Sequence, residues 1–418
     1  MTQSPTRRRL LGVALAAPAA VVATPSTATA AVVNAATGRP STAPPPVFTV
    51  ASKRIERALQ RMVSEGRVAG VSAAVWQGGA ERYFGAFGQA DVEAKRPMAR
   101  DTLARIWSMT KPVACVALMR LWDEGRFRLD DPIATYLPEF KSMRVAADER
   151  GPERPAQRPI LVRDVLRHTS GLTYDMEDSA ADRAYRAAQP FEKSPDLATF
   201  SRTVAALPLR HEPGTAWHYG TSTDIVARLV EVISGEPFDV HVRQRILQPL
   251  GMKETDWVQP ADRKPRLAAT YRLAAGEKPQ REVDFNFSFA TGGAGLIAPL
   301  DDYLRFARML LGEGELEGVR VLRPTTVRLM MVDQLDPSMA PRHFMRSAGV
   351  GFGLGGSVRI APALAAEAPG TVGEYSWGGA ASTLFWVDPA NQLAVVFFAQ
   401  KMPFDEQLHL ELRRAIYG

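Results

Sequence analysis

The chain has 418 residues, of which 46% are hydrophobic, 23% charged and 8% aromatic, and these values exclude collagen-like, coiled-coil and disordered classes. Its single cysteine, Cys115, excludes an intramolecular disulfide and any cysteine-based zinc or iron–sulfur site. The formal charge is +6, but Arg7, Arg8 and Arg9 lie at the N-terminus and no dense basic run follows them, so we expect no nucleic-acid partner.

The first 30 residues have the features of an export signal. Paired arginines in residues 6–11 precede an alanine-rich apolar run that is too short to span a membrane. Small residues at Ala28 and Ala30 fit a cleavage site after Ala30. The twin arginines resemble the signal of the translocase that carries folded proteins. We therefore expect export to the periplasm or the medium, with no integral membrane segment after cleavage; the alternative is a basic tail on a cytoplasmic protein.

Residues 31–48, rich in alanine, threonine and proline, predict a disordered linker. Apolar residues at helical spacing then predict an amphipathic helix over residues 52–65. Two strand-like runs, 68–77 and 82–90, flank a pair of glycines and predict a hairpin.

The C-terminal end of the chain shows the same combination of elements. Strand-like runs at residues 382–387 and 393–399 flank a turn at 388–391, and residues 404–416 have a helical pattern. Both ends of the chain thus predict helices packed with antiparallel strands.

Helical patterns dominate the middle of the chain, at residues 113–122, 164–168, 222–234 and 240–250. This organisation predicts an α+β fold in which a mostly helical unit is inserted into an α/β unit. The expected division is an α/β sandwich domain formed by residues 49–125 and 286–418, and a helical domain formed by residues 126–285.

Ser108 and Lys111 form an S-x-x-K motif at the predicted start of the helix over residues 113–122. Residues three apart on a helical turn share a face, so the lysine amine can reach the serine hydroxyl. A serine becomes a good nucleophile when a neighbouring base removes its proton. The structural alternative is an N-terminal capping serine followed by a lysine whose stem packs on the surface.

Two further segments accompany this motif. Tyr219 lies in a loop before the helix over residues 222–234, where its phenol could relay protons or could simply be a buried, hydrogen-bonded tyrosine. Trp377, Gly378 and Gly379 precede a strand-like run, where glycines allow close approach of a ligand or form a simple bulge.

These motifs together resemble the serine β-lactamase-like, penicillin-recognising hydrolases, and among them the class C-like esterases called family VIII carboxylesterases. The resemblance also includes the sequence HTSGL at residues 168–172 and LDDPI at 129–133, followed by YLP at 136–138. It implies a β-lactamase/transpeptidase-like fold, with an antiparallel sheet flanked by helices.

The resemblance also implies roles for individual residues. Ser108 would be the acylated nucleophile, and Lys111 and Tyr219 would share its proton and deliver it to the leaving group. The backbone amides of Ser108 and Ala380 would form the oxyanion hole. The implied reaction is hydrolysis of a small-molecule carboxylic ester with a short acyl chain, with no cofactor and no metal.

Two departures from the lactamase pattern affect the expected substrate. Tyr219, Gly220 and Thr221 replace the Y-x-N motif, so Thr221 stands where lactamases carry an asparagine that contacts substrate. Trp377, Gly378 and Gly379 replace K-T-G, which removes the cation and hydroxyl expected to bind a substrate carboxylate. Both changes favour esters over lactams. We expect four of these residues to line the substrate site: Thr221, Trp377, Gly378 and Gly379.

The sequence motifs give less support to other enzyme classes. No serine has glycine at both −2 and +2, as an α/β-hydrolase needs, and the six histidines include no H-E-x-x-H pair. His168 and His218 are expected to be structural. The alternatives left open are a β-lactamase or a D-amino-acid peptidase or DD-carboxypeptidase of the same fold, and a catalytically silent binding or scaffold protein.

Overall fold

The computed structural model describes residues 49–148, 151–273, 278–282, 286–339, 349–365 and 367–418. The predicted export signal and linker, residues 1–30 and 31–48, lie outside these residues and stay predictions. In the part of the chain that is described, no helix has the length and apolar character needed to cross a membrane.

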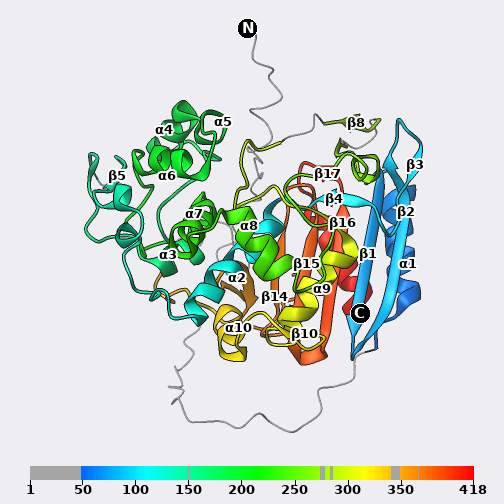
Figure 1. Ribbon diagram of the computed structural model, residues 1–418. Coiled ribbons are helices and arrows are strands. Elements are labelled where there is room, and N and C mark those ends of the chain that lie inside the picture. Colours follow the sequence, from blue (N-terminus) through cyan, green and yellow to red (C-terminus); the bar gives the residue numbers. More distant parts are fainter. Residues whose placement is uncertain (1–48, 149–150, 274–277, 283–285, 340–348, 366) are drawn as a thin grey trace.

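An eight-stranded antiparallel sheet, built from both ends of the chain, forms the centre of the fold (Figure 1). The strands follow the order β12 (Val350–Phe352), β13 (Ser357–Arg359), β14 (Tyr375–Gly378), β15 (Leu384–Asp388), β16 (Leu393–Ala399), β1 (Gly70–Gln77), β2 (Ala80–Asp91) and β3 (Arg96–Pro97). Strands β1 and β16 join the two ends, with Val71 opposite Ala399 and Gln77 opposite Leu393.

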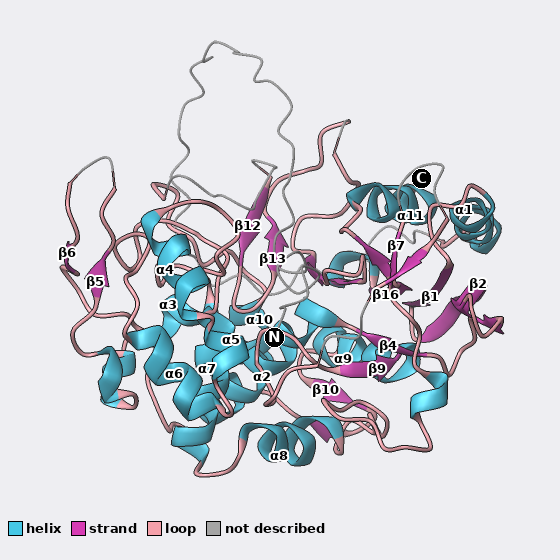
Figure 2. Cartoon of the chain, turned by 90° about the horizontal axis from the view of Figure 1, so that it is seen from above, coloured by secondary structure: helices cyan, strands magenta, loops and turns pink. Residues whose placement is uncertain are grey.

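Two terminal helices cover one face of this sheet. Figure 2 shows α1 (Ser52–Ser64) and α11 (Glu406–Tyr417) on one side of β1 and β16, and α9 (Leu300–Leu311) on the other. The buried face of α1 includes Ile55 and Leu59, which pack in one apolar cluster with residues of α11 and β16. Because β16 is covered on both faces, all seven of its residues are buried, which explains its continuous apolar sequence.

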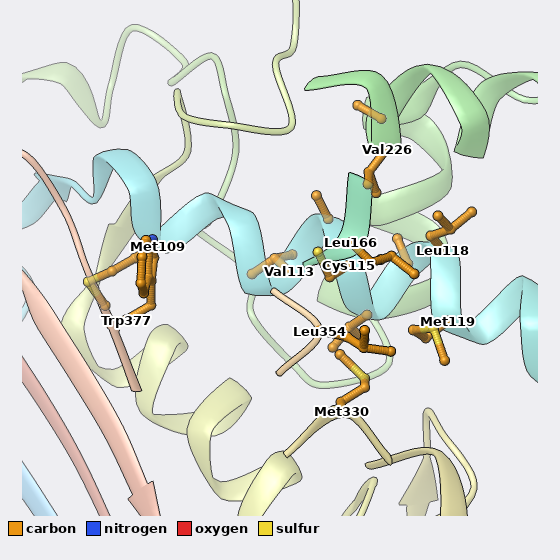
Figure 3. Packing of buried hydrophobic residues seen from close by; sticks show 14 of the residues in the cluster. Met109, Val113, Cys115, Leu118, Met119, Leu166, Val226, Met330, Leu354 and Trp377 are labelled. Carbon is orange, nitrogen blue, oxygen red and sulfur yellow. The ribbon is translucent and has the colours of Figure 1, made fainter. Parts of the chain in front are cut away.

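Helix α2 (Thr110–Asp123) passes through the larger core on the opposite face (Figure 3). Its side chains Val113, Cys115, Leu118 and Met119 are fully buried. A helix that is apolar all round is typical of a fully buried position. Since Ser108 and Lys111 lie at its start, the core fixes the place of the predicted motif.

The remaining helices lie mostly beside the sheet, on the far side of α2 (Figure 1). They are α3 (Val162–Leu166), α4 (Ala180–Ala188), α5 (Pro190–Lys193), α6 (Leu197–Ala205), α7 (Ser222–Ser234), α8 (Phe238–Val242), which continues as a π-helix over Arg243–Leu247, and α10 (Pro324–Met330). Three small two-stranded sheets are formed by β4 (Leu103–Arg105) and β9 (Ile297–Pro299), by β5 (Arg144–Val145) and β6 (Arg154–Pro155), and by β10 (Glu315–Leu316) and β11 (Val319–Arg320). A three-stranded sheet has the order β17 (Lys401–Met402), β7 (Tyr271–Arg272) and β8 (Gln280–Arg281).

The predicted terminal elements agree closely with the structure, whereas the middle of the chain agrees only in part. The predicted helix at 164–168 lies two residues earlier in the structure, because α3 begins at Val162 and ends at Leu166, and His168 has a φ of 57°, outside the helical region. The predicted helix at 240–250 begins earlier and becomes π-helical. The sequence patterns did not reveal α4, α5, α6, α9 or α10. The domain division at residues 125 and 286 stays a prediction.

Candidate active site

The candidate nucleophile lies in a tight turn between a strand and a buried helix. Strand β4 leads into a 3₁₀ turn, Trp107–Met109, and then into α2. Trp107 has a φ of 49°, in the left-handed region that a bulky residue rarely adopts. Such strain persists where the surroundings hold the backbone firmly, and it is frequent at functional sites. The turn therefore presents Ser108, which is half-buried, at the start of α2.

Hydrogen bonds from two other segments hold this turn. Thr110 Oγ1 donates to Trp107 O at 2.7 Å and accepts from Leu296 N at 3.2 Å. On the other side, Thr383 Oγ1 donates to Ile106 O at 3.2 Å. The position of Ser108 is thus fixed from both the segment before β9 and the segment before β15.

The three predicted catalytic side chains meet at Ser108 Oγ. Tyr219 Oη donates a hydrogen bond to Ser108 Oγ at 2.7 Å, and Lys111 Nζ lies 3.3 Å from the same oxygen. Ser108 and Tyr219 are partly exposed, whereas Lys111 is only 1% exposed. An amine and a phenol within hydrogen-bond reach of one hydroxyl are the groups that nucleophilic catalysis requires.

The buried Lys111 amine is held by a carbonyl and two aromatic rings. Its Nζ donates to Gly293 O at 2.7 Å. It also lies 4.6 Å from the ring centre of Tyr219 and 5.1 Å from that of Tyr174, distances at which a cation and a π-system attract each other. The capping alternative requires the Lys111 side chain to extend along the surface, whereas in the structure its amine lies in the interior.

Aromatic packing fixes the ring of Tyr219. Ring centres of His168, Tyr174, Trp377 and Trp217 lie 5.0, 5.3, 5.6 and 6.3 Å from its own. These distances match the usual range for interacting aromatic pairs. Because the ring is enclosed, its hydroxyl is directed at Ser108 with little freedom.

A glycine allows the Tyr219 loop to approach the segment 168–172. A Cβ on Gly220 would lie 2.1 Å from Leu172 O, so no larger residue fits without movement. His218 N donates to His168 O at 2.9 Å, and the hydroxyls of Ser170 and Ser222 are 2.8 Å apart. Residues 168–172, the HTSGL sequence, thus pack against the Tyr219 loop and hold it in place.

The predicted substrate-binding strand packs against the nucleophile turn. A Cβ on Gly379 would lie 2.3 Å from Ile106 O, and Gly379 N donates to Thr383 O at 2.9 Å. Gly378 and Ala380 are partly exposed beside it. The structure brings this segment next to Ser108, and the oxyanion role of the Ser108 and Ala380 amides stays a prediction.

Three of the predicted substrate-binding residues, Trp377, Gly379 and Thr221, are buried. Trp377 is 7% exposed, and its ring packs against Tyr219 and Phe352, with centroid distances of 5.6 and 5.2 Å. Thr221 is completely buried at the start of α7, so its side chain has no access to a cleft. Trp377 acts here mainly as a wall behind Tyr219, and the geometry gives Thr221 no substrate contact.

Both histidines near the site bond to threonines. His218 Nε2 lies 3.1 Å from Thr173 Oγ1, and His168 Nε2 lies 3.4 Å from Thr223 Oγ1. Burial, together with the positive charge of Lys111, lowers the pKa of His168 well below its usual value. A histidine that stays neutral beside Tyr219 contributes packing rather than charge.

Sequence analysis missed three residues that complete the surroundings of Lys111. Asp224, on α7, is completely buried; it accepts hydrogen bonds from Gly293 N at 2.8 Å and from Tyr174 Oη at 3.0 Å. Burial raises the pKa of the Asp224 carboxyl, while the charge of Lys111 and these hydrogen bonds oppose that rise. An aspartate five residues after Tyr219, in the first turn of α7, is the signal that could have indicated it.

A cavity of about 1550 Å³ lies beside the nucleophile turn. Its lining includes Trp107 and Leu296, which adjoin the site, and the rings of Trp257, Phe287 and Phe289. Ser108 does not line it, so the cavity's position alone gives it no acyl- or alcohol-binding role. Among the described residues, no group of three or more histidine, cysteine, aspartate or glutamate side chains could hold a metal ion.

Comparisons with known proteins agree on one family. The family model described as Beta-lactamase matches residues 55–417. Protein Rv1367c of Mycobacterium tuberculosis is 38% identical over 377 residues, covering 87% of this chain and 92% of that protein. Esterase EstB of Burkholderia gladioli is 30% identical over 394 residues, covering 87% and 95%. The solved structure of EstCE1, a hydrolase with promiscuous acyltransferase activity, has a TM-score of 0.76 and 29% identity, covering 88% and 98%.

Proposed function

Because the chain belongs to the beta-lactamase family, we propose that it is a serine carboxylesterase that hydrolyses short-chain esters through an acyl-enzyme on Ser108. One observation carries this proposal: Tyr219 Oη and Lys111 Nζ both lie within hydrogen-bond reach of Ser108 Oγ. An inactive relative would be expected to have lost one of these three groups, and all three are present.

In the proposed first step, Ser108 Oγ attacks the ester carbonyl carbon while its proton passes to the Lys111–Tyr219 pair. The carbonyl oxygen becomes an oxyanion that accepts hydrogen bonds from the amides of Ser108 and Ala380. When the tetrahedral intermediate collapses, the carbon–oxygen bond of the ester breaks and the leaving alcohol takes the proton. Water then attacks the acyl-enzyme in the same way and releases the acid.

The preference for esters over lactams rests on the groups around Ser108. Trp377 and Gly378 stand where lactamases carry a lysine and a threonine, so the strand offers no cation for a substrate carboxylate. A neutral ester needs only the nucleophile, the oxyanion hole and an apolar wall. The relatives EstB, an esterase, and EstCE1, a hydrolase, support the same choice.

Labelling with a fluorophosphonate tests the proposal against the silent-scaffold alternative. The expected result is one covalent adduct per chain, located on Ser108 by peptide mass mapping and absent from S108A. The S376A variant is a matched control, because Ser376 lies on β14, two residues before Gly378, and bonds to Ser357. It should be labelled like the unmodified chain. Absence of an adduct on the unmodified chain, together with no cleavage of a chromogenic ester, would favour a scaffold.

The proposal includes export by the twin-arginine route, supported by the basic, apolar and small-residue pattern of residues 1–30. The exported chain should then begin at Ala31. N-terminal sequencing of exported material tests the cleavage site, and replacement of Arg7 and Arg8 by lysine should retain the precursor in the cytoplasm.

A further inference from the structure

We infer that Asp224 is the positioning residue for Lys111: its carboxylate orients the buried amine and stabilises the ammonium that forms when Lys111 takes the Ser108 proton. The inference rests on the proposed function, because it assigns a role within the same reaction. It concerns a residue that lies outside the S-x-x-K motif and the Tyr219 loop.

Two bridges connect the Asp224 carboxylate to the Lys111 amine. Gly293 donates its N–H to Asp224 Oδ1 at 2.8 Å, and its carbonyl oxygen accepts from Lys111 Nζ at 2.7 Å. Tyr174 donates its hydroxyl to Asp224 Oδ2 at 3.0 Å, while its ring centre lies 5.1 Å from Lys111 Nζ. Each oxygen of the carboxylate is therefore fixed by a group that also contacts the amine.

The packing around these bridges leaves no room for another arrangement. A Cβ on Gly293 would lie 2.4 Å from Tyr174 Oη, and 2.7 and 2.9 Å from the two oxygens of Asp224. A glycine is thus required where the carboxylate, the phenol and the peptide meet. Asp224 and Lys111 are 0% and 1% exposed, so water cannot replace these contacts.

The Asp224 carboxylate stabilises the Lys111 ammonium electrostatically. A charge in a buried site is costly unless an opposite charge compensates it. Proton transfer breaks the Ser108 Oγ–H bond and forms an Nζ–H bond, which creates a cation at Lys111; Asp224 stays ionised and takes no proton. This is the logic of a nucleophile whose base is oriented and stabilised by a third, acidic group.

The other titratable groups around this pair come from two loops, the one between α3 and α4 and the one before α7. Tyr174 lies in the loop before α4, Tyr219 in the loop before α7, and His168 after α3. Burial raises the pKa of Tyr174 well above its usual value, with a further contribution from Asp224. Burial lowers the pKa of His168 well below its usual value. Both groups are therefore neutral near pH 7. Asp224 is then the group around Lys111 that can carry a negative charge, because Lys111 and the hydrogen bonds from Gly293 and Tyr174 oppose the rise that burial causes in its pKa.

The D224N variant tests the inference, because asparagine keeps the shape and can still accept from Gly293 N while losing the charge. We expect kcat on p-nitrophenyl butyrate to fall at least about 30-fold with KM unchanged within about twofold, since Asp224 is buried away from substrate. We also expect the acidic limb of the pH profile of kcat/KM to move to lower pH, because removing a buried negative charge beside the site disfavours the protonated state of the catalytic groups. A purely structural role would leave that limb in place.

Asp302 provides the matched control. It is another buried carboxylate, 7% exposed, whose pKa is raised by burial and which accepts hydrogen bonds from Glu254 N and Thr255 Oγ1. D302N should lose stability while keeping the pH profile. If D224N does not fold, Y174F replaces it: the ring over Lys111 remains, the hydroxyl to Asp224 is lost, and kcat should fall about threefold or more with KM unchanged.

The outcomes separate this inference from the proposed function. If the unmodified chain is labelled on Ser108 and cleaves esters, but D224N keeps its kcat within threefold and its acidic limb, only the positioning role is wrong. If D224N does not fold, an unchanged kcat in Y174F would likewise show that the positioning role of Asp224 is wrong. If the unmodified chain itself neither labels nor cleaves esters, the proposed function fails first.

Discussion

Tyr219 Oη donates a 2.7 Å hydrogen bond to Ser108 Oγ, although the two residues are 111 positions apart in the chain. This contact joins the strained turn after β4 to the loop before α7. The aromatic cluster around Tyr219 and the hydrogen bonds around Ser108 hold the two groups independently, so the contact is preformed.

Removal of this phenol should reduce turnover without disturbing the site. In Y219F the ring packing remains and only the hydroxyl is lost, so kcat should fall at least about a hundredfold, as expected for a positioned acid or base. Steady-state kinetics on a p-nitrophenyl ester measures this. Y136F is the control, because Tyr136 Oη donates to Asp131 Oδ2 at 2.7 Å, outside the Ser108 cluster, and its kcat should not change. A tenfold or smaller loss in Y219F would give Tyr219 a structural role.

Gly293 should tolerate no side chain. In G293A the added Cβ would press on Tyr174 and Asp224, which should displace the carbonyl that binds Lys111 and lower kcat at least about tenfold. G235A is the comparison: Gly235 has open space around it and a φ of 79°, so the change should cost about 1 to 2 kcal/mol of stability and leave kcat intact. Turnover by G293A at the unmodified rate would show that the loop around residue 293 can shift to accommodate a Cβ without loss of catalysis.

The bond that is cleaved should be an ester rather than a lactam. Strand β14 lacks the cation that would hold a lactam carboxylate, and such a charge-assisted hydrogen bond contributes about 1.5 to 3 kcal/mol. We expect kcat/KM on a short-chain p-nitrophenyl ester to exceed that on nitrocefin by at least about two orders of magnitude, or roughly 2.7 kcal/mol. Comparable values would indicate a lactamase or peptidase. A W377K/G378T double variant should narrow the preference for the ester over nitrocefin. It should also be less stable, because the lysine would replace a buried tryptophan.

The chain should lose stability between pH 6.5 and 4 through His409. Burial lowers the pKa of this histidine to about 4, and its Nε2 lies 3.0 Å from Ser382 O. The folded state keeps His409 neutral, whereas the unfolded chain binds a proton below about pH 6.5, so acidification favours unfolding by on the order of 3 kcal/mol at pH 4. H409Q should reduce this pH dependence in denaturant melts. An unchanged slope would mean that His409 is protonated in the folded state.

The terminal elements and the family could be predicted because their signals are local. The glycine pair at Gly78 and Gly79, with φ of 57° and 83°, forms the hairpin turn that the sequence indicates. The family model and the similarity to EstB and EstCE1 confirm the expected β-lactamase-like fold and its esterase relatives. The S-x-x-K spacing likewise places Lys111 beside Ser108, because one helical turn determines it.

The parts that sequence analysis missed depend on contacts between distant segments. Asp224 meets Gly293 and Tyr174 only after α7 and the loop before β9 have packed together, and no local pattern encodes that meeting. Thr221 was expected to contact substrate from its place two residues after Tyr219. In the structure the chain has already turned into α7 at that point, and packing buries the side chain completely.

The central claim is that an acyl group forms on Ser108 during turnover. The most direct measurement is mass spectrometry of the protein, quenched in acid during hydrolysis of p-nitrophenyl butyrate and then digested. We predict a butyryl group on the peptide that contains Ser108. Both the adduct and the turnover should disappear in S108A while that variant keeps its fold, because loss of one partly exposed, hydrogen-bonded hydroxyl costs about 1 kcal/mol. Turnover by S108A at most of the unmodified rate, or a butyryl group on another residue, would contradict it.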